Sequence, residues 1–177
     1  MQLRFAPIGL LVVLACSQNG RTRTEDAIGS DSQQNSRGQK PPAQTVTFAT
    51  PNGDVVVEVE VVATAAKITK GLMYREYLAP ESGMLFLMGG EAVHEFYMRN
   101  TLIPLDMIFI TRDFLVAGVV ENAAPRTETH RSVGTPSLYV LEVNGGWAAT
   151  HHVTAGTKLR FGGIGVAGSG SDTSNRL

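Results

Sequence analysis

Short runs of β-branched residues, separated by turn residues, are the feature that most limits the folds open to this chain. The runs at residues 45–50 and 54–62 flank Pro51-Asn52-Gly53, and an Asn-Gly pair suits the positive dihedral angles of a tight hairpin turn. In the second run, valines alternate with Glu58 and Glu60, which predicts one buried and one solvated face. We therefore expect the folded part of the chain to open with a β-hairpin.

Similar runs continue along the chain and predict further strands at residues 84–88, 95–99, 106–111, 114–121, 137–143 and 156–161. Most are joined by segments that contain Gly or Pro, and 106–111 and 114–121 by the turn Arg112-Asp113. The spacing of apolar residues predicts one short helix over 65–73, capped by Thr64. One or two helical turns are expected over 147–153. Many short strands with little helix predict a mainly β fold, a compact β-sandwich or barrel with one or two short helices.

The first 16 residues are typical of a secretory signal rather than of this fold. Arg4 supplies a positive charge before an apolar run at 8–15, which is too short for a permanent membrane-spanning helix and ends at Cys16, the single cysteine. The sequence VLAC at 13–16 resembles a bacterial lipobox, which implies a lipid anchor on Cys16. The protein is then expected to be exported to the periplasmic face of the envelope, and Ser17 favours the outer membrane. An ordinary signal peptide with an incidental cysteine is the alternative.

Composition divides the remaining chain into three parts. Residues 17–43 are rich in Ser, Gln, Asn, Gly and charge, which predicts a disordered tether. Residues 44–162 form the predicted β-rich domain, and the Gly- and Ser-rich residues 163–177 a flexible tail. No cysteine follows Cys16, so the core depends on apolar packing. With a net charge of −1 and no basic stripe, nucleic acid is not an expected partner.

Several polar residues embedded among large apolar ones form the candidate site: Arg75, Arg99, Asn100, Thr101, Asp106 and Glu142. Burying an unpaired charge is costly, so these groups need partners. The first interpretation is an internal network in which an arginine pairs with Asp106 or Glu142, and it takes precedence because structural ion pairs imitate sites. The second is a pocket whose Arg, Asn and Thr donors hold a small oxygen-rich ligand, such as a sugar or a carboxylate.

Signals for catalysis and metal binding are weak. The sequence has no nucleophile elbow, phosphate loop or metal-protease helix. Asp106 and Glu142 would serve as acid and base of a glycan- or ester-directed hydrolase only at a suitable separation. His151 and His152 are adjacent, and neighbouring residues on a helix point about 100° apart. We therefore expect neither a metal nor a cofactor.

Four sequence blocks resemble the signature of domain-of-unknown-function family 192, which is widespread in bacteria and archaea. They are GLMYR at 71–75, GMLF at 83–86, MRNT at 98–101 with IPLD at 103–106, and LE at 141–142 followed by GG at 145–146. Arg99 stands where many relatives carry Lys. The resemblance, over roughly residues 46–161, implies a compact β-rich fold of jelly-roll type and no established activity. We thus expect an envelope lipoprotein that binds a small ligand or an envelope protein, with the hydrolase as the alternative.

Overall fold

The computed structural model describes residues 42–166. They form seven strands and two short helices: β1 (Thr45–Thr50), β2 (Gly53–Val62), α1 (Ala65–Lys70), β3 (Ser82–Ala92), β4 (Leu105–Ile110), β5 (Val116–Ala123), β6 (Ser137–Asn144), α2 (Trp147–Thr150) and β7 (Lys158–Gly162). The predicted mainly β fold with short helices is confirmed. No helix in this part of the chain has the length and apolar content needed to cross a bilayer.

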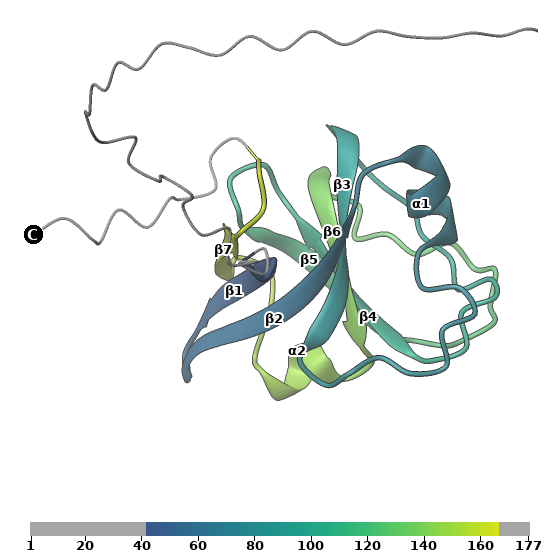
Figure 1. The fold of residues 1–177 in the computed structure, drawn as a ribbon, viewed down its shortest axis with the longest axis horizontal. Coiled ribbons are helices and arrows are strands. Elements are labelled where there is room, and N and C mark those ends of the chain that lie inside the picture. Colours follow the sequence, from purple (N-terminus) through teal and green to yellow (C-terminus); the bar gives the residue numbers. More distant parts are fainter. Residues whose placement is uncertain (1–41, 167–177) are drawn as a thin grey trace, which may run out of the picture. The chain divides into compact units, whose positions relative to one another are not determined.

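The strands form one curled sheet in the order β5-β4-β6-β3-β2-β1-β7 (Figure 1). All neighbours are antiparallel except β2 and β3, which run parallel and are connected through α1. At one end the two edge strands meet, because the Val116 N–H donates to the Thr157 carbonyl at 2.9 Å and the Leu159 N–H donates to the Phe114 carbonyl at 3.0 Å. The sheet is therefore a partly closed barrel, which leaves less edge exposed.

The opening hairpin forms as predicted, with Thr50 paired to Gly53 across a turn in which Gly53 has φ 108°. The alternation in β2 is also confirmed, since Val57 and Val59 are buried and the glutamates beside them are exposed. The predicted helix begins where expected: the Thr64 hydroxyl accepts from the Lys67 N–H at 3.4 Å.

The sheet separates two apolar clusters, because successive residues of a strand point to opposite faces. One cluster, around Phe48, Leu85 and Leu141, packs against Trp147 of α2. The other cluster is built on Met84, Phe86, Met107, Phe109 and Val140 of the central strands, with Leu72, Leu78 and Met98 packed over them from the segments after α1 and β3. Of the two predicted buried acids, Glu142 lies on this second face and Asp106 on the first.

The segment after β3 differs from its prediction. Residues 95–99 were expected to form a strand, but only Phe96 makes a β-bridge, with Arg131. The chain leaves extended geometry at Asn100, which has φ 56°. Loop 124–136 holds the segment in place: the Phe96 and Arg131 backbones exchange hydrogen bonds of 2.9 and 2.8 Å, and the Met98 N–H donates to the Thr127 carbonyl at 2.9 Å.

The predicted signal peptide with Cys16, and almost all of the predicted tether and tail, fall outside the described residues. They remain predictions.

Candidate functional site

A cavity of about 190 Å³ lies between the end of α1, the second face of the sheet and the segment 95–101. Its walls are mostly apolar, formed by Ile68, Leu72, Met73, Phe86, Met88 and Phe96. Its polar lining consists of Thr69, Lys70, Glu95, Tyr97, Thr101 and Glu142, and the backbone of Gly71 completes it. A cavity that combines apolar walls with polar groups is a common form of a small-molecule site.

Glu142 is the unusual group in this cavity. It stands on β6 between Met84 of β3 and Met107 of β4 and is only 5% exposed. Within residues 42–166 its carboxyl group has no hydrogen bond or ion pair. Burial alone raises the pKa of this carboxyl to about 8, because a low-polarity environment disfavours the charged form. Glu142 is therefore mostly protonated at neutral pH.

Gly71 brings the backbone close to the Phe86 ring and to this carboxyl. It ends α1 with φ 45°, and its N–H donates to the Lys67 carbonyl at 2.9 Å. A Cβ atom at Gly71 would lie 3.3 Å from the Phe86 ring and 3.7 Å from Oε2 of Glu142. The glycine thus serves both as a helix stop and as the point where the backbone approaches the cavity.

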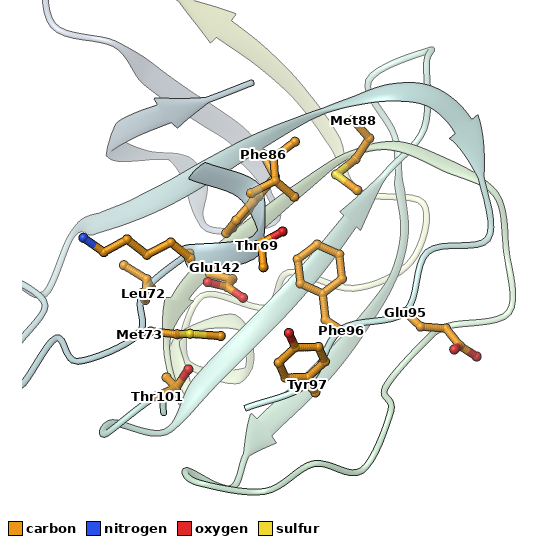
Figure 2. Close-up of a pocket in the computed structure, with 13 residues that line it drawn as sticks. Thr69, Leu72, Met73, Phe86, Met88, Glu95, Phe96, Tyr97, Thr101 and Glu142 are labelled. Atoms are coloured by element: carbon orange, nitrogen blue, oxygen red, sulfur yellow. The ribbon is translucent and has the colours of Figure 1, made fainter. Parts of the chain in front are cut away.

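Aromatic rings form one wall of the cavity. Phe96 makes edge-to-face contacts with Phe86 and Phe109, at centroid distances of 5.4 and 5.9 Å. Figure 2 shows the Glu142 carboxyl in the middle of the group, with Phe96 and Tyr97 to its right in that view. Since edge-to-face packing fixes ring orientation, this wall is pre-formed.

The two arginines of the candidate site lie outside this cavity. Arg75 pairs with Glu60 at 2.7 Å, and Arg99 pairs with Glu128 at 2.9 Å, with both pairs on the surface. The Arg99 guanidinium also lies 5.1 Å from the centroid of the Tyr97 ring. The predicted internal network, in which these arginines pair with Asp106 or Glu142, therefore does not form. Long cationic side chains keep their charged ends in water while their stems cover apolar surface.

Asn100 and Thr101 are the last two residues of a four-residue turn that begins at Met98. The Thr101 N–H donates to the Met98 carbonyl at 3.1 Å, and the buried Thr101 side chain lines the cavity. The Asn100 amide donates to the sulfur of Met73 at 4.0 Å. Asn100 and Arg99 line a neighbouring surface depression rather than the cavity itself.

Asp106 is fully buried, and both of its carboxylate oxygens accept backbone hydrogen bonds. Its Oδ1 accepts from the N–H groups of Asn122 and Gly146 at 2.7 and 2.9 Å, and its Oδ2 accepts from the N–H of Ala148 at 2.8 Å. It therefore ties β5 and the start of α2 to β4.

Asp106 and Glu142 do not face each other. Asp106 pairs in register with Val143, whereas Glu142 pairs with Met107, so the two carboxyl groups project from opposite faces of the sheet. This corrects the expectation that Asp106 and Glu142 act as acid and base, on which the hydrolase alternative depended. The two groups cannot flank one substrate bond.

The histidines are not grouped with two other potential metal ligands in the described residues. No group of three potential metal ligands occurs within the described part of the chain. His151 instead contacts the carboxylate of Glu81 at 3.4 Å and the ring of Trp147 at 4.5 Å. These residues border an open surface depression on another part of the domain.

Of the predicted site residues, the structure brings only Thr101 and Glu142 into one cavity. Sequence reasoning missed the aromatic wall of Phe96 and Tyr97 and the two methionines, Met73 and Met88, that line the same cavity. The sequence signal that could have indicated this cavity is Gly71. A glycine within a helical pattern indicates that another group packs closely against its backbone.

Comparison with known proteins places the chain in a family without an assigned activity. No curated protein matches it. A solved structure of a protein of unknown function from Novosphingobium aromaticivorans DSM 12444 is 41% identical, covers 66% of this chain and 83% of that one, and superposes with a TM-score of 0.64. A structure from Sinorhizobium meliloti 1021, provisionally described as a transcription regulator, is 35% identical, covers 72% of this chain and 100% of that one, and has a TM-score of 0.65. The model of family DUF192, described as "Uncharacterized ACR", matches residues 47–161, and the chain belongs to that family.

Proposed function

We propose that the domain is a small-ligand-binding module whose site is the cavity at Glu142. The observation that carries the proposal is the Glu142 carboxyl, which is buried, has no partner within residues 42–166 and lines a cavity with pre-formed aromatic walls. The described residues give the Glu142 carboxyl no hydrogen-bond partner, and a ligand with a polar group would supply one.

The cavity limits the ligand to a compact molecule. Cavities of about 150 Å³ accommodate benzene, and this one measures about 190 Å³. Of the donors expected to hold an oxygen-rich ligand, only Thr101 lines it, whereas Arg75, Arg99 and Asn100 do not. The ligand we propose is therefore smaller and less oxygen-rich than a sugar, with an apolar body and one polar group.

We further propose that this module is held at the envelope by a lipid on Cys16. The proposal rests on the VLAC ending of the apolar run and the polar stretch that follows it. An envelope protein as partner is the alternative to a small ligand. We assign no nucleic-acid role, because the net charge is −1 and a basic surface is the usual signature of such a role.

We do not extend the proposal to catalysis. Asp106 projects from the face opposite Glu142 and is occupied by three backbone N–H groups. A hydrolase at Glu142 would need another group to activate water or stabilise the intermediate.

Native mass spectrometry of the full-length protein tests the binding function. The protein is incubated with a small-metabolite extract, and Glu142→Leu is compared with wild type and with Glu58→Gln, a change at an exposed position of β2. We expect a bound small molecule on wild type and Glu58→Gln that is absent from Glu142→Leu. Identical spectra for wild type and Glu142→Leu would show that the cavity at Glu142 is not a ligand-binding site.

A further inference from the structure

We propose that the cavity selects a small organic ammonium ion, with its positive group against Glu142 and its apolar body against the rings of Phe86 and Phe96. The inference rests on the proposed function and adds the chemical class of the ligand. Three features of the cavity support it: charge, wall chemistry and size.

The charge argument begins with what surrounds Glu142. The neighbouring strands present Met84 and Met107 beside it, and neither side chain titrates. Lys70 and Glu95 line the cavity from exposed positions, and Tyr97 from a half-buried one. Lys70 forms no ion pair with Glu142 in the described residues, while the Glu95 carboxylate contacts Nδ1 of His130 at 2.9 Å.

Within residues 42–166, no cationic side chain therefore pairs with Glu142. A buried carboxylate is stable only when a cation or several donors accompany it. An ammonium ligand provides both charge and donors in one group. An anionic ligand would meet a like-charged or neutral acid, and the two candidate arginines are engaged elsewhere, at Glu60 and Glu128.

The walls suit the apolar body of an organic cation. Aromatic rings bury apolar surface, and their polarizable electrons are compatible with a positive charge nearby. Phe86, Phe96 and Tyr97 supply rings, and Met73 and Met88 supply polarizable sulfur atoms around the same space (Figure 2). The volume of about 190 Å³ suits a single ring or a short branched chain that carries the amine.

A matched series of probes separates the charge classes: benzylamine, benzyl alcohol and benzoate have nearly the same shape but are a cation, a neutral molecule and an anion. Isothermal titration calorimetry of the full-length protein at pH 7 should give the order benzylamine, benzyl alcohol, benzoate from tightest to weakest. Binding of the cation must ionise Glu142, so roughly 0.9 proton should be released per benzylamine at pH 7. Titrations in two buffers with different ionisation enthalpies measure that release.

The pH dependence of binding supplies a second readout. Protons compete with the cation for Glu142, so the affinity for benzylamine should rise roughly fiftyfold from pH 6 to pH 8. Benzyl alcohol should show little change over the same range. In Glu142→Gln, benzylamine should lose both its pH dependence and its advantage over benzyl alcohol, whereas Glu58→Gln should behave like wild type.

The outcomes distinguish this inference from the function on which it rests. Equal binding of benzylamine and benzyl alcohol without proton release would overturn the cation preference and leave a ligand-binding cavity. Tightest binding of benzoate would overturn it too. Absence of binding by all three probes would also overturn it, and the metabolite screen by mass spectrometry would then decide the binding function separately.

Discussion

Asp106 and Glu142 lie one register position apart on the paired strands β4 and β6 and project from opposite faces of the sheet. The first carboxyl group accepts three backbone hydrogen bonds, and the second has no partner within residues 42–166. One of these buried acids therefore holds the fold together, while the other opens into a cavity. Their different surroundings predict different responses to the same type of substitution.

Asp106→Asn should destabilise the domain. Asparagine keeps one acceptor oxygen but turns an NH₂ donor toward backbone N–H groups that now donate to Asp106. We expect a loss on the order of 3 kcal/mol in the free energy of unfolding, measured by urea denaturation. A variant as stable as wild type would show that these bonds contribute little.

Stability should fall as pH rises, because of Glu142. Its pKa is about 8 in the folded state against an ordinary value of 4.5, so between these values the folded state binds more protons than the unfolded state. The contribution of Glu142 to the free energy of unfolding is complete below pH 4.5 and is lost as pH approaches 8. The slope is up to about 1.4 kcal/mol per pH unit. Urea unfolding of wild type and Glu142→Gln across this range measures the difference. Parallel profiles would contradict the raised pKa.

Glu142→Leu should stabilise the ligand-free protein at pH 8. The substitution replaces a buried acid without a partner by an apolar side chain of similar size, beside Met84 and Met107. We expect a gain on the order of 2 kcal/mol, read from thermal unfolding, together with loss of ligand binding. Higher stability together with lost binding would indicate that Glu142 is kept for function at the expense of stability. A less stable variant would argue that Glu142 has a structural role.

Gly71→Ala should destabilise the domain where the matched change Gly89→Ala does not. Gly71 has φ 45°, and an added Cβ would lie 3.3 Å from the Phe86 ring, whereas a Cβ at Gly89 meets nothing within 4 Å. We expect a loss of about 1–2 kcal/mol for Gly71→Ala and a change within about 0.5 kcal/mol for Gly89→Ala. Chemical denaturation of both variants tests this, and equal effects would mean that Gly71 is not required by its conformation.

Cys16→Ala should release the protein from the membrane fraction, because one or more acyl chains on Cys16 would provide the anchor. Fractionation of cells expressing the full-length chain, with Ser17→Ala as a control at the adjacent position, measures retention. If Cys16→Ala remained in the membrane fraction, the lipid anchor would be ruled out.

The sequence predicted the elements of the fold better than their arrangement. Alternation in β2 and the Pro51-Asn52-Gly53 turn identify the first hairpin because both signals are local. The parallel pairing of β2 with β3 and the contact of β5 with β7 join residues far apart along the chain, and no local pattern encodes them. Residues 95–99 do not form the expected strand, because they pair with loop 124–136 through a single β-bridge, at Phe96.

The same limit applies to the candidate site. The position of Asp106 and Glu142 among large apolar residues indicated that both are buried, and the structure confirms this. Which face each carboxyl group occupies depends on the register between β4 and β6, which a single sequence does not reveal. Arg75 and Arg99 were expected to pair inward, but their long side chains reach glutamates at the surface instead.

The most direct test of the binding site is a carbon-13 NMR titration of the Glu142 side-chain carboxyl in the full-length protein, without and with the benzyl probes. We expect this carboxyl to titrate near pH 8 without ligand and its resonance to move when benzylamine or benzyl alcohol is added. Titration near pH 4.5, with no movement on addition of any probe, would contradict a binding site at Glu142.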